Sequence, residues 1–226
     1  MAFTLCATAA SAQAPQAPVD LRSATNFAVL GGTTVTNTGK SVIVGDLGVW
    51  AGSAYVPGTP PGLVVGTIYV ADRTAQTAQG DLTIAYNDAA GRTVGPVSVA
   101  GNLGGETLAP GLYKSTSSLE ISSGDLTLAG DRNAVFIFQI ATTLVTTSGR
   151  KVILLGGVKP ANIFWQVGSS ATLGTHSVFQ GTIMAYTSVT ITKGATLNGR
   201  ALAQNGAVTL DTNVVLKPPL VKIHRN

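Results

Sequence analysis

Residues 171–210 read ATLGTHSVFQGTIMAYTSVTITKGATLNGRALAQNGAVTL, and this stretch repeats itself about every 18 residues. Residues 178–185 match residues 196–203 at an offset of 18. A repeat of this length accommodates three short strands with their turns, so the stretch predicts a β-solenoid of triangular cross-section. Around these blocks, three triplets with a central Thr recur at offsets of 18 and 19, namely Ala171-Thr172-Leu173, Val189-Thr190-Ile191 and Val208-Thr209-Leu210.

The repeat continues upstream in a looser form, because Ile163-Phe164-Trp165-Gln166-Val167 resembles Phe136-Ile137-Phe138-Gln139-Ile140. Coils of a solenoid stack ~4.8 Å apart, and their inward aliphatic and aromatic side chains form one continuous core. We therefore expect Phe136 and Trp165 to lie in the core. The composition agrees, since 45% of the 226 residues are hydrophobic and only 11% are charged, which is typical of a folded chain and too apolar for a disordered one.

One segment has the periodicity of a helix. Between residues 72 and 90, small and apolar side chains recur at spacings of three and four. Asp72 suits the N-cap, and Gly91 stands where a left-handed residue ends many helices. Such a helix, ~27 Å long at ~1.5 Å per residue, matches a stack of about six coils. The sequence thus predicts a mainly β fold, an irregular β-solenoid with one long α-helix packed alongside.

The ends of the chain differ from this domain, which we place at residues 20–216. Residues 1–14 are expected to be a signal peptide, because the segment is short and apolar and Ala12-Gln13-Ala14 has the form of a cleavage site. Cleavage after Ala14 makes the protein secreted, removes the only cysteine, Cys6, and leaves residues 15–19 as a leader. Within the domain, residues 50–70 interrupt the repeat with three prolines and predict a loop or an end cap.

The net charge of +4 does not indicate a nucleic-acid partner. Lys217, Lys222 and Arg225 all lie in residues 217–226, which we interpret as a solubilising basic tail. No basic run is interleaved with aromatic residues, as a phosphate-binding surface requires. No apolar run reaches the ~20 residues that insertion into a membrane needs.

Alternation along the predicted strands decides which side chains point away from the core. In each triplet the two aliphatic residues point inward, so the central Thr and the residue two positions before it point outward. The same pattern applies more loosely to other strands. The side chains expected outside are Thr34, Thr36, Thr67, Ser118, Thr143, Ser170, Thr172, Ser188, Thr190, Ala207 and Thr209.

This outward set is small, uncharged and mostly hydroxyl-bearing. Repeated at ~4.8 Å between coils and ~6.6 Å along a strand, it forms an array that can order water. Thr is also a common strand residue, so the pattern by itself favours an ordinary solenoid surface.

Long blocks of the chain resemble one known family, the microbial ice-binding (antifreeze) proteins that have a discontinuous β-solenoid and a flanking helix. The resemblance covers about residues 20–215. The matching blocks include Asn26-Phe27-Ala28-Val29-Leu30, Gly45-Asp46-Leu47-Gly48, residues 81–92, residues 103–113, residues 134–140, residues 162–167 and Leu197-Asn198-Gly199-Arg200-Ala201-Leu202-Ala203.

The resemblance implies a right-handed solenoid in which the order of the coils in space differs from their order in the chain. It also implies that one β-face, and not the helix, binds ice. The triplet strands correspond to that face, so the outward side chains given above become candidate ice contacts. The expected activities are thermal hysteresis and inhibition of ice recrystallisation. The expected partner of this monomer is the surface of an ice crystal, and no cofactor is implied.

Two other classes of function, enzymes and binding modules, are weighed against this expectation. Enzymes with β-solenoids need clustered acids or a metal, whereas the ten acids here are scattered, and His176 and His224 are too few for a metal or nucleophile site. We therefore expect neither catalysis nor a metal. A cell-envelope adhesion or carbohydrate-binding module is the main alternative, and it would need exposed aromatic residues in a groove.

Overall fold

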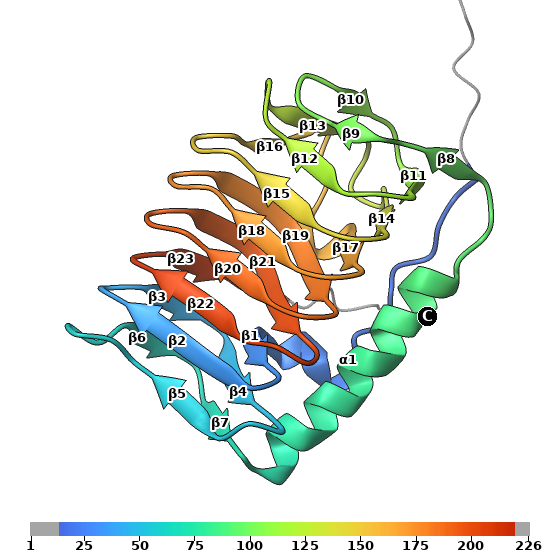
Figure 1. The fold of residues 1–226 in the computed structure, drawn as a ribbon. Coiled ribbons are helices and arrows are strands. Elements are labelled where there is room, and N and C mark those ends of the chain that lie inside the picture. Colours follow the sequence, from blue (N-terminus) through green and yellow to red (C-terminus); the bar gives the residue numbers. More distant parts are fainter. Residues whose placement is uncertain (1–13, 220–226) are drawn as a thin grey trace, which may run out of the picture.

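The computed structural model describes residues 14–219. The expected signal peptide, apart from Ala14, lies outside these residues, as do residues 220–226 of the expected tail. The described chain forms parallel strands stacked in coils, with one long helix beside them (Figure 1). Each coil contributes a strand to each of three faces, so the predicted mainly β fold, a solenoid of triangular cross-section with a helix alongside, is confirmed.

The first face, here called the helix-covered face, is buried on both sides except at its two edge strands. Its strands carry near-continuous apolar runs such as FIFQI and IFWQV, because their side chains enter either the solenoid core or the layer under the helix. In spatial order the strands are β8 (Pro96–Ser98), β11 (Gly111–Ser115), β14 (Phe136–Ile140), β17 (Ile163–Val167), the second halves of β19 (Val178–Ala185) and β21 (Thr196–Ala203), β1 (Phe27–Gly31), β4 (Asp46–Val49) and β7 (Ile68–Val70).

The second face, here called the hydroxyl face, contains the Thr triplets. Its strands are short and alternate between buried and outward side chains, as one-sided burial requires. In spatial order they are β9 (Gly101–Asn102), β12 (Leu119–Ile121), β15 (Leu144–Thr146), β18 (Ala171–Leu173), β20 (Val189–Ile191), β22 (Val208–Asp211), β2 (Thr34–Thr38) and β5 (Ala54–Val56).

The third face, here called the aliphatic face, is also one-sided. It consists of β10 (Thr107–Leu108), β13 (Leu126–Ala129), β16 (Val152–Leu155), the first halves of β19 and β21, β23 (Val214–Leu216), β3 (Val42–Val44) and β6 (Leu63–Val65).

Strands β19 and β21 each continue around a corner of the triangle. Gly181 and Gly199 are paired at this corner, and Gly181 has a φ of +104°. A Cβ on Gly199 would lie 1.8 Å from the carbonyl oxygen of Gly181. The two backbones therefore approach so closely that only glycine fits.

The order of the coils in space differs from their order along the chain, as the resemblance implies. Strands β1–β7 form the coils at one end, and helix α1 (Arg73–Gly91) then carries the chain to the far end, where β8 starts (Figure 1). The chain returns coil by coil until β21 and β22 pair with β1 and β2. The coil β1–β3 is thus inserted between the last coil of the chain and the coil β4–β6.

The solenoid core contains a row of stacked aromatic rings. The ring centroids of Phe138 and Trp165 are 3.9 Å apart, and Tyr113 and Phe179 extend the row on either side at 5.2 and 4.9 Å. Phe136 and Trp165 are fully buried, as predicted. Rings in register on neighbouring coils add specific contacts to the apolar burial.

Helix α1 starts as predicted, because the carboxylate of Asp72 accepts a hydrogen bond from the amide of Ala75 at 2.8 Å. The predicted left-handed end at Gly91 is wrong, since Gly91 is the last helical residue and Arg92 is extended. The buried side chain of Gln139 caps the helix instead. Its amide donates to the carbonyls of Ala89, Ala90 and Arg92 at 2.8, 3.1 and 2.8 Å.

Residues 50–70 are not a loop. They contain β5, β6 and β7, which complete the last coil at one end of the stack. The prolines lie in the turn between β5 and β6, so they do not remove ladder hydrogen bonds. Of the two predicted alternatives, a loop or an end cap, the segment is thus an end cap, and this cap consists of strands.

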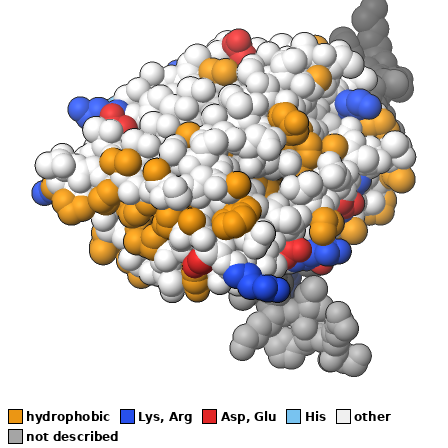
Figure 2. Space-filling model, turned by 60° about the horizontal axis from the view of Figure 1, so that its bottom comes forward, with side chains coloured by type: hydrophobic (Ala, Val, Ile, Leu, Met, Phe, Trp, Pro, Cys, Tyr) orange, Lys and Arg blue, Asp and Glu red, His pale blue; other side chains and the backbone are white. Residues whose placement is uncertain are grey.

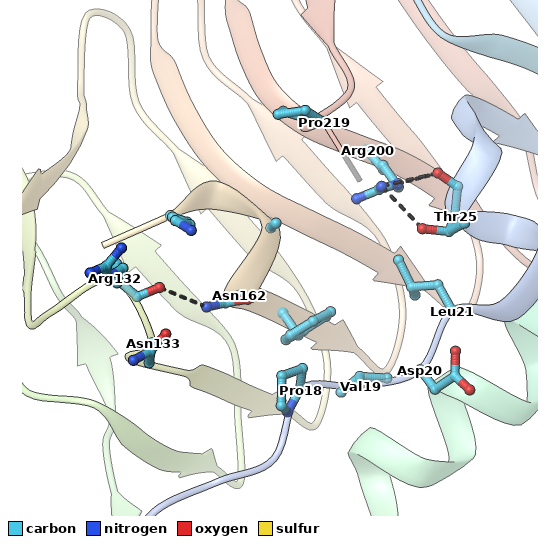
Figure 3. A pocket seen from close by; sticks show the side chains of 13 residues that line it. Pro18, Val19, Asp20, Leu21, Thr25, Arg132, Asn133, Asn162, Arg200 and Pro219 are labelled. Carbon is cyan, nitrogen blue, oxygen red and sulfur yellow. Dashed lines mark hydrogen bonds between the residues drawn. The ribbon is translucent and has the colours of Figure 1, made fainter. Parts of the chain in front are cut away.

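The N-terminal segment packs along the molecule. Val19, within the expected leader, is buried under the helix layer together with Leu21. A cavity of about 690 Å³ lies between this segment and the loops that follow β13 and β16 (Figure 3). At its rim the guanidinium of Arg200 donates to the carbonyl of Thr25 at 3.1 and 3.0 Å, which ties the segment to β21.

Candidate functional site

Of the three faces, two are open to solvent. The helix-covered face is occupied by α1, whose buried residues pack on Leu30, Phe164, Met184 and Leu202. The hydroxyl face and the aliphatic face carry no further layer of described residues. A surface-binding function must therefore use one of these two sheets or an end of the stack.

Parallel register aligns the outward residues of the hydroxyl face in rows across the coils. Four threonines stand side by side at equivalent positions of neighbouring strands, and we call them the threonine ladder. Its members in spatial order are Thr36, Thr209, Thr190 and Thr172. Neighbouring rungs of a sheet are ~4.8 Å apart, so the ladder is a straight row of four evenly spaced side chains.

The hydroxyls of the threonine ladder are free. None of the four donates to or accepts from another group within residues 14–219, and all four side chains are at least partly exposed. Each inward neighbour along the strand, such as Val189 and Ile191 on either side of Thr190, is fully buried. The backbone therefore holds these hydroxyls outward at fixed spacing, available to solvent.

The second predicted row consists of the residues two positions before the ladder positions. Unlike the threonines of the ladder, its serines form hydrogen bonds within the protein. The hydroxyl of Ser170 accepts from the amide of Ser188 at 3.3 Å, and that of Ser188 accepts from the amide of Ala207 at the same distance. Ser118 is hydrogen-bonded to the hydroxyls of Thr142 and Thr143 at 2.8 and 2.9 Å. The serines thus stabilise the strand starts, and Thr34, opposite Ala54, completes the row beside β5.

Thr67 does not belong to this face. It directly precedes β7, whose pairing partner β4 is part of the helix-covered face, and its amide donates to the carboxylate of Asp46 at 2.9 Å. The alternation around Thr67 resembles that of the triplets, yet it belongs to a different side of the triangle. The remaining ten predicted residues lie together on the hydroxyl face.

The threonine ladder is part of a longer row of outward side chains, here called the middle row, and the sequence did not predict all of its members. Val56 continues the threonine ladder beyond Thr36, and Val145, Glu120 and Asn102 continue it beyond Thr172. The signal was present, because Leu144-Val145-Thr146 and Leu119-Glu120-Ile121 have the same buried–outward–buried alternation as the Thr triplets. These two triplets differ from the predicted ones only in that their central residue is not Thr.

The aliphatic face offers no comparable row of hydroxyls. Its outward side chains near the β5–β7 end are Val44, Leu63, Val65, Val214 and Leu216, which are 36 to 58% exposed. In Figure 2 hydrophobic side chains gather toward this end of the molecule, next to a broad area with few charged or hydrophobic side chains. The hydroxyl face is therefore the more polar of the two candidate surfaces.

The cavity beside the N-terminal segment does not resemble a hydrolytic site. Asp20 is the only acid among its described lining residues, whereas glycoside hydrolysis uses a pair of carboxylates. Across residues 14–219, no three His, Cys, Asp or Glu side chains are grouped so that they would hold a metal ion. His176 lies in a turn with a φ of 56°.

Comparison with known proteins gives a consistent result. The profile of the family described as Ice-binding-like matches residues 29–216. An ice-binding protein of Nostoc sp. (strain HG1) is 51% identical over 198 residues, which cover 86% of this chain and 72% of the relative. An ice-binding protein of Flavobacterium frigoris (strain PS1) is 41% identical over 216 residues, covering 88% and 76% respectively.

Solved structures agree with these relatives. The crystal structure of an ice-binding protein from an Antarctic biological consortium superposes with a TM-score of 0.88 at 53% identity, covering 91% of this chain and 93% of that one. The structure of an ice-binding protein from the ascomycete Antarctomyces psychrotrophicus gives a TM-score of 0.84 at 39% identity, covering 90% and 100%.

Proposed function

Because the chain belongs to the Ice-binding-like family, we propose that it adsorbs to ice through its hydroxyl face. The observation that carries this proposal is the threonine ladder. It places four unpaired hydroxyls in register on an exposed sheet, between two valines that continue the row without charge.

The chemistry of the face suits a surface made only of water. Ice offers no charge and no apolar group, so adsorption must add up many weak contacts at matched spacings. Rungs at ~4.8 Å and alternate residues at ~6.6 Å supply a regular two-dimensional grid. The Thr hydroxyl can anchor a water molecule, while its methyl group and those of Val56 and Val145 favour ordered water around them. Adsorption of this kind produces thermal hysteresis and inhibits recrystallisation.

We further propose that the protein acts as a secreted monomer and not as an enzyme. Secretion rests on the pattern of residues 1–14, and the absence of catalysis on the scattered acids. The same proposal includes neither a nucleic-acid partner nor insertion into a membrane. No helix between residues 14 and 219 combines the length and the hydropathy of a membrane span.

Partition into slowly growing ice tests the function directly. We expect the wild-type protein to enter the ice fraction, and Thr190→Tyr, which places a bulky ring in the middle of the threonine ladder, to remain largely in the liquid with most hysteresis lost. Thr127→Tyr, on an outward position of the aliphatic face, is the matched control and should behave as wild type. Full hysteresis in folded Thr190→Tyr would mean that another surface binds ice. Retention on glycans without partition into ice would favour a carbohydrate-binding module.

A further inference from the structure

The middle row of the hydroxyl face has a charged end. From β5 to β15 its six side chains are uncharged, and the next position, on β12, is Glu120. We propose that Glu120 ends the ice-contacting area, and that removing its carboxylate extends this area by one coil. The inference rests on the proposed function of the hydroxyl face and deepens it by naming the residue that limits it.

Glu120 is held outward by its strand. Leu119 and Ile121 on either side of it are fully buried, so the carboxylate projects from the same surface as the threonine ladder. Its side chain is exposed, and it forms neither an ion pair nor a hydrogen bond with any residue between 14 and 219. No described residue therefore compensates this charge, and solvent hydrates it.

A solvated carboxylate opposes adsorption in two ways. Its hydration shell must be partly removed when ice approaches, and an unpaired charge loses much free energy on desolvation. The glutamate side chain is also longer than Thr or Val, so it stands above the plane that the other six side chains share. Both effects keep the ice lattice away from the β12 coil.

The position beyond Glu120 cannot extend the row. The side chain of Asn102 on β9 is used to hold the adjoining turns. Its carbonyl oxygen accepts from the amides of Gly104 and Ser122 at 2.8 and 3.0 Å, and its amide donates to the hydroxyl of Ser123. Glu120 is thus the last outward position in the row that is free to change.

A second acid on the sheet lies outside the row. Asp211 is the last residue of β22 and pairs with Thr38, one row away from the threonine ladder on its far side. Its carboxylate accepts a hydrogen bond from the hydroxyl of Thr212 at 3.0 Å, toward the turn. Of the acids of the described chain, Glu120 alone is in line with the ladder.

The test compares three variants with wild type by thermal hysteresis and by the fraction that enters ice. Glu120→Thr should raise hysteresis at equal concentration by at least about 1.2-fold, since the uncharged row grows from six positions to seven at ~4.8 Å per rung. Glu120→Lys keeps a long charged side chain and should give no gain. Glu106→Thr removes an exposed acid that precedes β10 on another face and should match wild type.

Two results would overturn the boundary: no gain in Glu120→Thr, or an equal gain in Glu120→Lys or Glu106→Thr. Thr190→Tyr in the same series separates this inference from the proposed function. If Thr190→Tyr loses hysteresis while Glu120→Thr equals wild type, the boundary is wrong and the face is right. If Thr190→Tyr keeps full hysteresis, the face is wrong and the boundary is wrong with it.

Discussion

Thr36 and Thr209 are direct neighbours in parallel register, although one lies in the first coil of the chain and the other in the last. Their contact exists because helix α1 carries the chain away after β7 and the later coils return to meet β2. The threonine ladder is thus assembled from both ends of the sequence, with Thr36 as its only member outside the C-terminal third.

Thr36→Tyr should therefore reduce hysteresis about as strongly as Thr209→Tyr. Both substitutions place a ring in the same row of the hydroxyl face, one on each side of the β2–β22 boundary. Hysteresis measured at equal concentrations of folded protein checks this expectation. Normal activity in Thr36→Tyr beside an inactive Thr209→Tyr would show that ice contacts only the C-terminal coils.

Arg200→Ala should destabilise the protein by about 1.5–3 kcal/mol, the range for hydrogen bonds to a charged group. Arg200 is 3% exposed, and its guanidinium holds the carbonyl and hydroxyl of Thr25 and the hydroxyl of Thr182. Burial lowers the pKa of Arg200 to about 10, so the group is still charged at neutral pH. Denaturant unfolding measures the loss.

Lys193→Ala is the control for that experiment, because Lys193 is exposed in the turn after β20 and its side chain contacts no partner in the described chain. Its effect should stay within about 0.5 kcal/mol. Equal stabilities for the two variants would mean that the Arg200–Thr25 contact does not stabilise the fold.

Gln139→Ala should lower the free energy of unfolding by about 1–3 kcal/mol, because three carbonyls at the end of α1 lose their buried donor. Gln180→Ala serves as the comparison, since Gln180 is a half-buried strand residue whose side chain caps no helix. Faster amide exchange in the last turn of α1 would locate the effect. Unchanged exchange there would argue against the capping role of Gln139.

Gly199→Ala should abolish or severely impair folding, because the added methyl group would overlap the backbone of Gly181. Gly80→Ala, on the exposed side of α1 with no atom within 4 Å of the new Cβ, should instead stabilise the helix by about 1 kcal/mol. Thermal melting distinguishes the two. A normal melting temperature for Gly199→Ala would contradict the close approach of the two coils at this corner.

Dialysis against EDTA should leave both stability and hysteresis unchanged. Within residues 14–219 no acid or histidine cluster is arranged for a metal, and the threonine ladder acts through hydroxyl and methyl groups. Hysteresis before and after dialysis is the measurement. A loss that Ca²⁺ restores would reveal an ion site that the proposed function does not include.

Local patterns in the sequence were sufficient for most of the elements, although not for the strands of residues 50–70, and for the direction of most side chains. Residues such as Val189, Thr190 and Ile191 alternate between core and solvent because a strand places successive side chains on opposite sides of the sheet. The spacing of three and four likewise predicts helix α1 and its start at Asp72. Both properties depend only on residues a few positions apart.

Only the tertiary structure decided which outward residues share a face and where that face ends. Thr67 and Thr34 have similar local patterns, yet β7 pairs on the helix-covered face and β2 on the hydroxyl face. Gln139 is a second example, because it caps the end of α1 although the Arg92 carbonyl that it binds lies 47 residues away in the chain. Pairing between distant coils depends on the path of the whole chain, including the helix that reverses its direction along the stack. The sequence by itself therefore determined the threonines as outward strand residues, and the stacking of first and last coils made them a ladder that ends at Glu120.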